Sequence, residues 1–350
     1  MFDKFFKKFT SDIGMDLGTS STLVYVKGRG IVLSEPSIVA INQKTGRVVA
    51  VGEDASQMVG RTPAHIEATK PLEGGVISNF EVGEEMVAYF LKKGIAVTGN
   101  RFFRPRVVVS VPSDITNVER RAVRDAVMSA GARSVHIVEA PMAGAIGVNM
   151  PVFEPVGNMI IDIGGGTTDI AVISLGGVVR SKNLHVAGDK LNQDIISYIR
   201  DEFKILLGER TAEEVKMAIG SVRKQDGPGE SLVRGRDMIT GLPREVALTD
   251  ADIREAIFSS INTFVDSVKE VLESTPPEVV SDIMRRGIVL VGAGARIKGL
   301  PALLEKELEI PVNLAEDPLT AVVRGTGVIL DDFERFREVL IDNEEELPPR

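Results

Sequence analysis

The chain has 350 residues, no cysteine and a formal net charge of −9, from 41 basic and 50 acidic residues. Without cysteine it has no disulfide and no thiolate metal site, and an acidic chain is a poor match for general nucleic-acid binding, which needs basic faces. We therefore expect no nucleic-acid partner, and the length is sufficient for two domains.

The chain begins with an amphipathic pattern. In residues 1–10, MFDKFFKKFT, phenylalanines recur at i, i+3, i+4 and i+7, with lysines on the other side. Such a helix lies in the interface of a membrane, and we predict this for residues 1–10. The alternative is that these side chains pack on the chain's own domain. The phenylalanines are Phe2, Phe5, Phe6 and Phe9.

Short β-branched runs then alternate with helical patterns, which predicts mixed sheets covered by helices, an α/β architecture. The predicted strands lie at 11–17, 21–27, 106–112, 134–140, 158–163, 169–174 and 286–292. The predicted helices lie at 82–93, 116–130, 188–207, 249–273 and 300–308.

One pattern occurs twice. Residues 12–26 and 159–172 both give a strand, an Asp, an apolar residue, a glycine-containing turn with Thr, and a second strand. Self-similarity of this kind indicates two related domains facing each other, although chance resemblance between glycine-rich hairpins is the alternative.

The two turns are candidate phosphate cradles. Glycine lets phosphate oxygens approach the backbone N–H groups, and hydroxyl side chains add donors. The residues are Gly18, Thr19, Ser20 and Ser21 in the first turn, and Gly164, Gly165, Gly166, Thr167 and Thr168 in the second.

Asp16 and Asp162 each end a strand just before a cradle. A carboxylate repels phosphate unless a hard cation lies between them, and Mg²⁺ takes oxygen ligands while keeping several waters. We therefore predict that both carboxylates contact Mg²⁺, through water. The alternative is that each Asp caps its own turn.

Other nucleotide motifs are missing from the sequence. No G-x-x-x-x-G-K-[ST] run is present, so a P-loop is excluded, and no G-x-G-x-x-G follows a strand. A small-residue turn does follow the strand at 286–292, and it permits close approach of a flat ring or a ribose. Its residues are Gly292, Ala293, Gly294 and Ala295.

Two further features have open interpretations. Glu213 and Lys216 share a helix face, which alone favours a solvated ion pair. Phe102 and Phe103 lie between arginines in a turn, so they are either an exposed partner-binding pair or core aromatics at a strand start.

With these residues in order, the chain resembles the actin, hexokinase and heat-shock chaperone superfamily, and within it the MreB family. The resemblance rests on runs spread over residues 12–330: DLGTSSTLVYVKGRGIVLSEPS, VGRTP, VERRAV, DIGGGTTDIAVISL, GERTAEEVK, PPEVVSDI and EDPLTAVVRGTGVIL. It implies an actin-like fold of two related domains, each with a mixed β-sheet flanked by helices, and ATP or ADP with Mg²⁺ in the cleft between them.

The resemblance also implies roles for residues. Glu213, Lys216 and 292–295 would surround the adenosine, and the loop of Phe102 and Phe103 would insert into the membrane. Expected domain bounds are 11–145 with 326–350, including a small subdomain at about 33–75, and 146–325, including one at about 190–260. The implied partners are copies of the chain in protofilaments, the inner face of the cytoplasmic membrane, and membrane-anchored cell-wall elongation proteins.

One departure concerns catalysis. The family usually has Glu directly before Pro-Met-Ala, where it positions the attacking water, but here Ala140 occupies that place and Glu139 precedes it. Strand alternation predicts that Glu139 points away, which leaves Thr167 to hold the water in part. We expect a weak ATPase at most, with Thr167 and Glu139 as the catalytic candidates.

Smaller departures are Ala293 within the usual triple glycine, which we expect to cause mild crowding, and Ser21 where Asn is common. The alternatives to a filament protomer are a small-molecule kinase of the superfamily, a chaperone-like ATPase, and a family paralogue with impaired hydrolysis.

Overall fold

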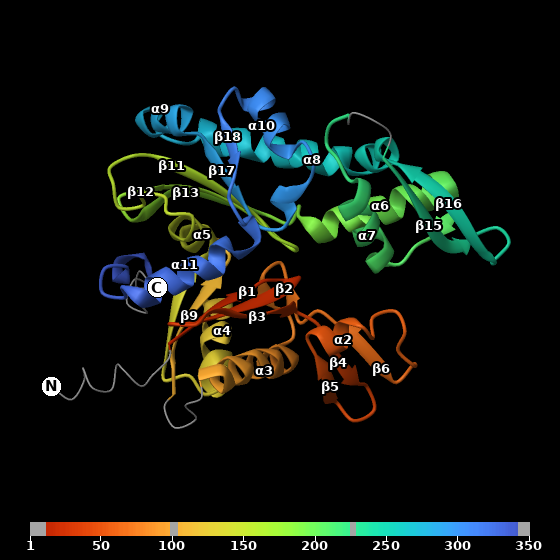
Figure 1. Cartoon of the computed structure of the whole chain (residues 1–350), viewed down its shortest axis with the longest axis horizontal. Coiled ribbons are helices and arrows are strands. Elements are labelled where there is room, and N and C mark those ends of the chain that lie inside the picture. Colours follow the sequence, from red (N-terminus) through yellow and green to blue (C-terminus); the bar gives the residue numbers. More distant parts are fainter. Residues whose placement is uncertain (1–11, 99–103, 225–228, 342–350) are drawn as a thin grey trace.

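The computed structural model describes residues 12–98, 104–224 and 229–341. Figure 1 shows two halves, one above the other, each built around a mixed sheet with helices on its outer side.

The first half contains a five-stranded sheet in the order β10-β9-β1-β2-β3. β10, β9 and β1 run parallel, whereas β1, β2 and β3 are antiparallel neighbours. The strands are β1 (Ile13–Leu17), β2 (Ser21–Val26), β3 (Gly30–Pro36), β9 (Arg106–Val111) and β10 (Ser134–Glu139).

The second half repeats this arrangement in the order β13-β12-β11-β17-β18. β11, β17 and β18 run parallel, and β11, β12 and β13 are antiparallel neighbours. The strands are β11 (Asn158–Ile163), β12 (Thr168–Ser174), β13 (Gly177–Leu184), β17 (Ile288–Val291) and β18 (Val312–Leu314).

The identical strand order, with the repeated sequence pattern on β1–β2 and on β11–β12, confirms the prediction of two related domains. The central strands β9, β11 and β12 are nearly continuous apolar runs because both faces of the sheet are covered there. β11, for example, is buried along nearly its whole length.

Helices α3 and α4 cover the first sheet, and α8, α9 and α10 cover the second. α4 begins at a capping box in which Thr116 and Glu119 satisfy each other's backbone N–H groups. The bounds of these helices are α3 (Phe80–Thr98), α4 (Asn117–Ser129), α8 (Asp250–Glu273), α9 (Pro277–Arg286) and α10 (Leu300–Leu308). A further helix, α6 (Gly188–Phe203), packs on α8.

Two helices, α5 (Ala140–Gly147) and α11 (Ala321–Asp331), lie between the sheets and pack on each other (Figure 1). A separate hydrophobic cluster forms around them, with side chains from both sheets such as Val108 and Ile160. This cluster connects the separate cores of the two halves.

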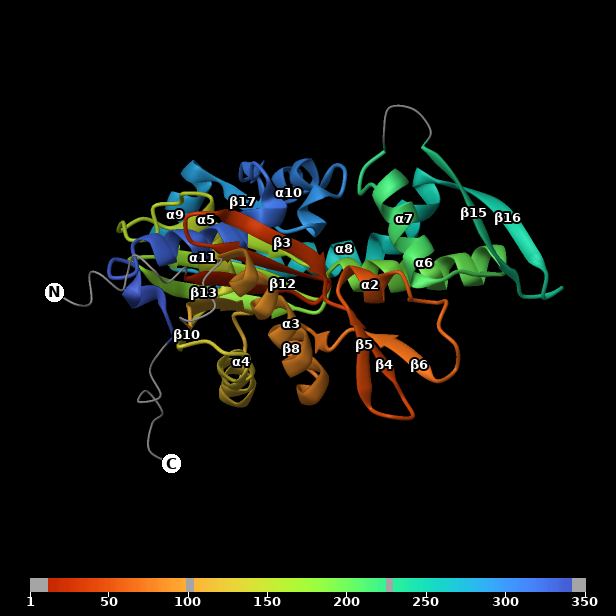
Figure 2. The same cartoon turned by 60° about the horizontal axis from the view of Figure 1, so that its bottom comes forward.

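Each half carries a small lobe on the same side of the molecule (Figure 2). The first small lobe is a β5-β4-β6 sheet with α2, and the second is a β14-β15-β16 sheet with α7. The first comprises β4 (Val39–Asn42), β5 (Arg47–Val51), α2 (Glu53–Ser56) and β6 (Ile66–Thr69), followed by the short hairpin β7 (Leu72–Glu73) and β8 (Val76–Ile77). The second comprises β14 (Ile205–Leu206), α7 (Glu209–Ile219), β15 (Glu230–Asp237) and β16 (Pro243–Thr249).

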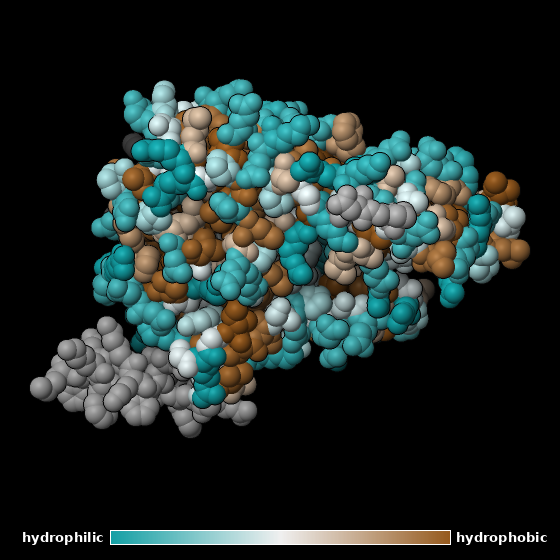
Figure 3. Space-filling model, turned by 45° about the horizontal axis from the view of Figure 1, so that its top comes forward, coloured by the Kyte–Doolittle hydropathy of each residue, from teal (hydrophilic) through white to brown (hydrophobic). Residues whose placement is uncertain are grey.

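The face shown in Figure 3 mixes hydrophilic and apolar residues, and apolar side chains gather at the far end of the second small lobe. There Met238, Ile239 and Leu242 lie exposed at the β15–β16 turn.

Candidate functional site

The two halves present the same tight turn to each other. In the β1–β2 turn the Gly18 N–H donates to the Ser21 carbonyl at 3.1 Å, and in the β11–β12 turn the Gly164 N–H donates to the Thr167 carbonyl at 2.9 Å. The same hydrogen bond closes both turns, and residues of both turns line one cavity.

The turns interlock, and glycine makes this contact possible. A β-carbon on Gly165 would lie 1.9 Å from the Ser20 Oγ, and one on Gly166 would lie 2.4 Å from the Thr19 Oγ1. Neither glycine has a positive φ, so close approach and not backbone conformation requires glycine here.

A cavity of about 120 Å³ lies between the turns. It brings together most of the residues that the sequence singled out from the two cradles, the strand ends and the small-residue turn. Among its lining residues are Asp16, Gly18, Thr19, Ser20, Ser21, Ala140, Asp162, Gly164, Gly165, Gly166, Thr167, Asp169, Gly292 and Ala293.

Some predicted residues lie behind this cavity. Thr168 is fully buried, and its hydroxyl donates to the Val186 carbonyl at 2.7 Å, so it holds the end of β13. Gly294 and Ala295 belong to a short 3₁₀ turn, and Ala295 is buried.

Ala293 has φ −65° and ψ −38°, an ordinary helical conformation, so its methyl group causes no backbone strain. Gly292 is different, with φ +85° and a position where a β-carbon would lie 2.4 Å from the Ile163 carbonyl oxygen. Within this loop, Gly292 is therefore the glycine that the backbone conformation requires.

Among the residues that the structure describes, three carboxylates, Asp16, Asp162 and Asp169, line the cavity, and no lysine, arginine or histidine does. Burial raises the pKa of Asp16 to about 6, although a hydrogen bond from the Ser110 Oγ at 2.7 Å opposes the rise. Burial and then the charges of Asp16 and Asp169 raise the pKa of Asp162 well above its usual range.

A pocket with this charge fits a divalent cation, because a cation removes the repulsion between Asp16 and Asp162. Within the described ranges no three acidic or histidine side chains form a metal cage. Two carboxylates assisted by water and phosphate oxygens match the coordination habit of Mg²⁺, which rarely uses an all-protein cage.

Asp169 was missed by the sequence reasoning. Its Oδ1 accepts from the Ser113 N–H of the first half at 3.0 Å and from the Asn183 Nδ2 of the second half at 2.9 Å. This buried carboxylate therefore connects the two halves beside the cavity.

Ala140 lines the cavity between the turns, and Glu139 does not. The Glu139 Oε2 is buried and has no hydrogen-bond partner among the described residues. Burial, followed by the charge of Asp169, raises the pKa of Glu139 to about 7. Ala140 thus contributes only a methyl group to the wall where the family pattern has a carboxylate.

A second, open cavity of about 1000 Å³ extends from the cradles between the two small lobes. Glu213 lines it, and Lys216 lies beside it on α7 with a side chain that is only 9% exposed. The Lys216 Nζ contacts the Glu213 Oε2 at 2.8 Å and the Gly188 carbonyl at 2.9 Å, so the pair is built into the cleft wall and is not a solvated ion pair.

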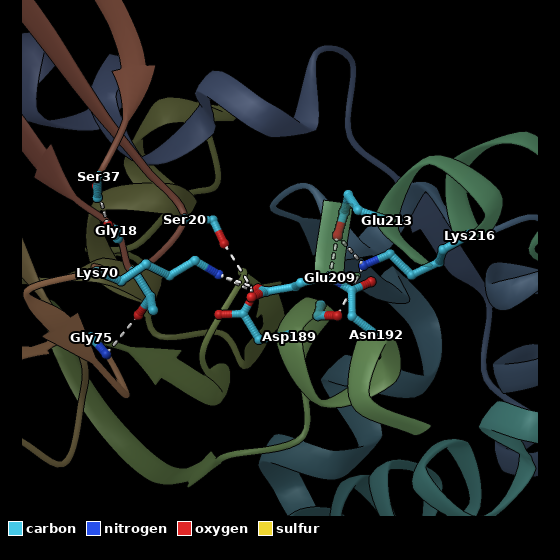
Figure 4. A network of polar contacts seen from close by, with 12 residues as sticks. Gly18, Ser20, Ser37, Lys70, Gly75, Asp189, Asn192, Glu209, Glu213 and Lys216 are labelled. Atoms are coloured by element: carbon cyan, nitrogen blue, oxygen red, sulfur yellow. Dashed lines mark hydrogen bonds and ion pairs between the residues drawn. The ribbon is translucent and has the colours of Figure 1, made fainter. Parts of the chain in front are cut away.

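The structure adds residues to this wall that no sequence pattern indicated. Asn192 of α6 is buried, and its Nδ2 donates to the Glu213 Oε2 at 2.5 Å (Figure 4). On the opposite side the Gly75 N–H donates to the Thr19 Oγ1 at 2.9 Å, which fixes the β7–β8 turn over the first cradle.

The residues predicted to bind membrane, Phe2, Phe5, Phe6, Phe9, Phe102 and Phe103, lie outside the described residues. Over the described part of the chain, no helix combines the length and the apolar character that a membrane span requires.

Two related α/β halves, each with a glycine turn that faces the other across a cleft, define an actin-like protein. Solved structures show the same fold: MreB5 of Spiroplasma citri bound to ADP superposes with a TM-score of 0.89 at 36% identity, covering 94% of this chain and 98% of that one. A MamK double helical filament superposes with a TM-score of 0.78 at 22% identity, covering 91% of this chain and 98% of that one. At this low identity the match supports the fold alone.

The chain belongs to the MreB/Mbl protein family, whose model matches residues 10–338. It is 47% identical to the cell shape-determining protein Mbl of Bacillus subtilis (strain 168) over 94% of this chain and 98% of that protein. It is 49% identical to the cell shape-determining protein MreB of Escherichia coli (strain K12) over 95% of this chain and 96% of that protein. The resemblance noted in the sequence is confirmed.

Proposed function

We propose that this chain binds ATP with Mg²⁺ between its halves and polymerises with copies of itself. The filaments lie at the inner face of the cytoplasmic membrane and help to organise cell-wall synthesis and rod shape. The observation that carries the proposal is the pair of interlocked cradles with Asp16 and Asp162 behind them.

In this proposal the backbone N–H groups and hydroxyls of residues 18–21 and 164–167 hold the phosphates, and Thr168 supports the second turn from behind. Asp16 and Asp162 hold Mg²⁺ through water, and the bound ion neutralises phosphate charge. Glu213 and Lys216, at the larger cavity, and the turn at 292–295, whose first two residues line the smaller one, contact the adenosine. Related structures support nucleotide binding, since MreB5 of Spiroplasma citri was solved with ADP and with AMPPNP.

The role in cell shape is supported by the names of the relatives, which are cell shape-determining proteins at 47% and 49% identity over nearly their whole length. We place the protein in the cytoplasm, peripheral to the membrane, with membrane-anchored cell-wall elongation proteins as partners.

The test is sedimentation and electron microscopy of the purified chain with ATP and Mg²⁺, with ADP, and with ATP plus EDTA. We expect filaments with ATP and Mg²⁺ and their loss with EDTA. Asp162→Asn should weaken Mg²⁺-dependent ATP binding by about tenfold or more, because it removes one of two carboxylates from the cation. Asp266→Asn, at an exposed position on α8, is the control and should bind as the wild type.

A chain that binds no ATP under any condition would contradict the proposal at its first step. A chain that binds ATP but remains monomeric at all concentrations would contradict the filament.

A further inference from the structure

Lys70 connects the two halves across the mouth of the cleft. It lies between β6 and β7 in the first half, and its Nζ contacts the Asp189 Oδ1 at 2.9 Å and the Glu209 Oε1 at 2.8 Å in the second (Figure 4). Other ion pairs, such as Lys93 with Glu35 and Lys269 with Glu307, remain within one half.

The surroundings of the three side chains strengthen this contact. Asp189 and Glu209 lie in the first turns of α6 and α7, where the helix dipole stabilises an anion. Burial opposes the charge on Lys70, but hydrogen bonds and charges from Glu209 and Asp189 outweigh it and raise the pKa of Lys70. With 27% of its side chain exposed, Lys70 is also less screened by solvent than a surface lysine.

The same contact reaches both phosphate cradles. The Asp189 N–H donates to the Gly165 carbonyl at 2.8 Å in the second cradle. The Asp189 Oδ1, which is the atom that Lys70 contacts, also lies 3.5 Å from the Ser20 Oγ in the first cradle. A shift of either cradle would therefore move the Asp189 carboxylate that Lys70 contacts.

Lys70, Asp189 and Glu209 all line the large cavity that leads to the cradles. A nucleotide moving between solvent and the cradles would pass these side chains. The ion pairs hold the two walls of this cavity together, and the turns of the two halves are in close contact.

We propose that Lys70 is a latch that closes the cleft through Asp189 and Glu209, and that opening this latch controls the rate of nucleotide exchange. The inference rests on the proposed nucleotide binding. It predicts that weakening the ion pairs accelerates exchange, while the phosphate and adenosine contacts remain intact.

The first measurement is release of a fluorescent ATP analogue (mant-ATP) chased by excess ATP, below the concentration at which filaments form. Lys70→Gln should release it about three to ten times faster than wild type, the range expected for losing two partly exposed ion pairs. Glu209→Gln should give a smaller increase, and the double variant should match Lys70→Gln alone. Lys269→Gln, which breaks a pair remote from the cleft, should match wild type.

Salt provides a readout that a general structural defect would not give. Release from wild type should accelerate as KCl rises, because salt screens the latch, whereas release from Lys70→Gln should depend much less on KCl. If Lys70→Gln releases mant-ATP at the wild-type rate and with the wild-type dependence on KCl, the proposal is overturned.

A second measurement does not require nucleotide. Because the chain has no cysteine, Lys44→Cys and Leu242→Cys place spin labels on the two small lobes without competing thiols. Adding Lys70→Gln should lengthen and broaden the distance between the labels. If mant-ATP does not bind to the wild type, the proposed function fails, and the distance between the labels then tests the ion-pair closure by itself. A distance distribution unchanged by Lys70→Gln would overturn the proposal.

Discussion

At the scale of single residues, Ala140 bears on whether the proposed nucleotide binding leads to hydrolysis. It lines the cavity between the two turns, and the nearest acidic side chain along the chain, Glu139, lies outside that lining. A methyl group neither accepts a proton nor orients water, so at this position the proposed site lacks a group that activates the attacking water.

Ala140→Glu should therefore raise the rate of phosphate release by about tenfold or more, the lower end of what a positioned base contributes. ATP affinity should change little, because the cradles are untouched. The measurement is phosphate release at saturating ATP. Ala140→Met, of similar length and without a polar group, is the control. Equal rates in the two variants would show that added bulk, and not the carboxylate, causes any change.

The cradles were predictable from the sequence because they are local: glycine, hydroxyl and Asp residues lie within one hairpin, and the pattern occurs twice. Asp169 could have been found too, since pairing across the turn places it opposite Asp162. Lys70 could not, because its partners lie 119 and 139 residues away and no periodic pattern connects them.

At the scale of secondary-structure elements, the junction of the two halves depends on the crossing of α5 and α11. A β-carbon on Gly147 of α5 would lie 1.9 Å from the Ala321 carbonyl oxygen, and one on Gly325 of α11 would lie 1.8 Å from the Ala143 carbonyl oxygen. The helices therefore touch backbone to backbone, and side chains at these positions would push the two sheets apart.

Gly147→Ala should destabilise the protein by about 2 kcal/mol or more, because rigid backbone must move to admit the methyl group. Gly144→Ala in the same helix meets the end of the Ile160 side chain at 3.2 Å, so it should change stability by less than about 1 kcal/mol. Urea unfolding midpoints of the two variants test this. Similar midpoints would contradict the close crossing.

Sequence patterns predicted the central strands of both large sheets, but they missed β3, β13 and β18 and failed on this junction. α5 is buried on nearly all sides, so it has no polar face and no helical periodicity to detect. The predicted helix at 188–207 is also too long. The structure ends it at Phe203 because Lys204 adopts a left-handed conformation with φ +57°, and β14 begins at the next residue.

At the scale of the whole molecule, the net charge of −9 opposes binding to an anionic membrane, so the proposed attachment requires a local apolar and basic segment. The predicted helix at 1–10 offers phenylalanines and lysines that each contribute at most about 1 to 3 kcal/mol. One such helix binds weakly and reversibly, whereas a filament repeats it along its length.

Membrane binding should therefore depend on polymerisation. With ATP and Mg²⁺ above the assembly concentration, the wild type should sediment with anionic liposomes, and below it most of the protein should remain in solution. Deleting residues 1–10, or changing Phe102 and Phe103 to Ser, should reduce the liposome-bound fraction while filaments still form without lipid. Liposome flotation measures the bound fraction, and electron microscopy checks the filaments. Equal binding above and below the assembly concentration would show that a single protomer binds strongly enough, and that repetition along a filament is not what holds the protein at the membrane.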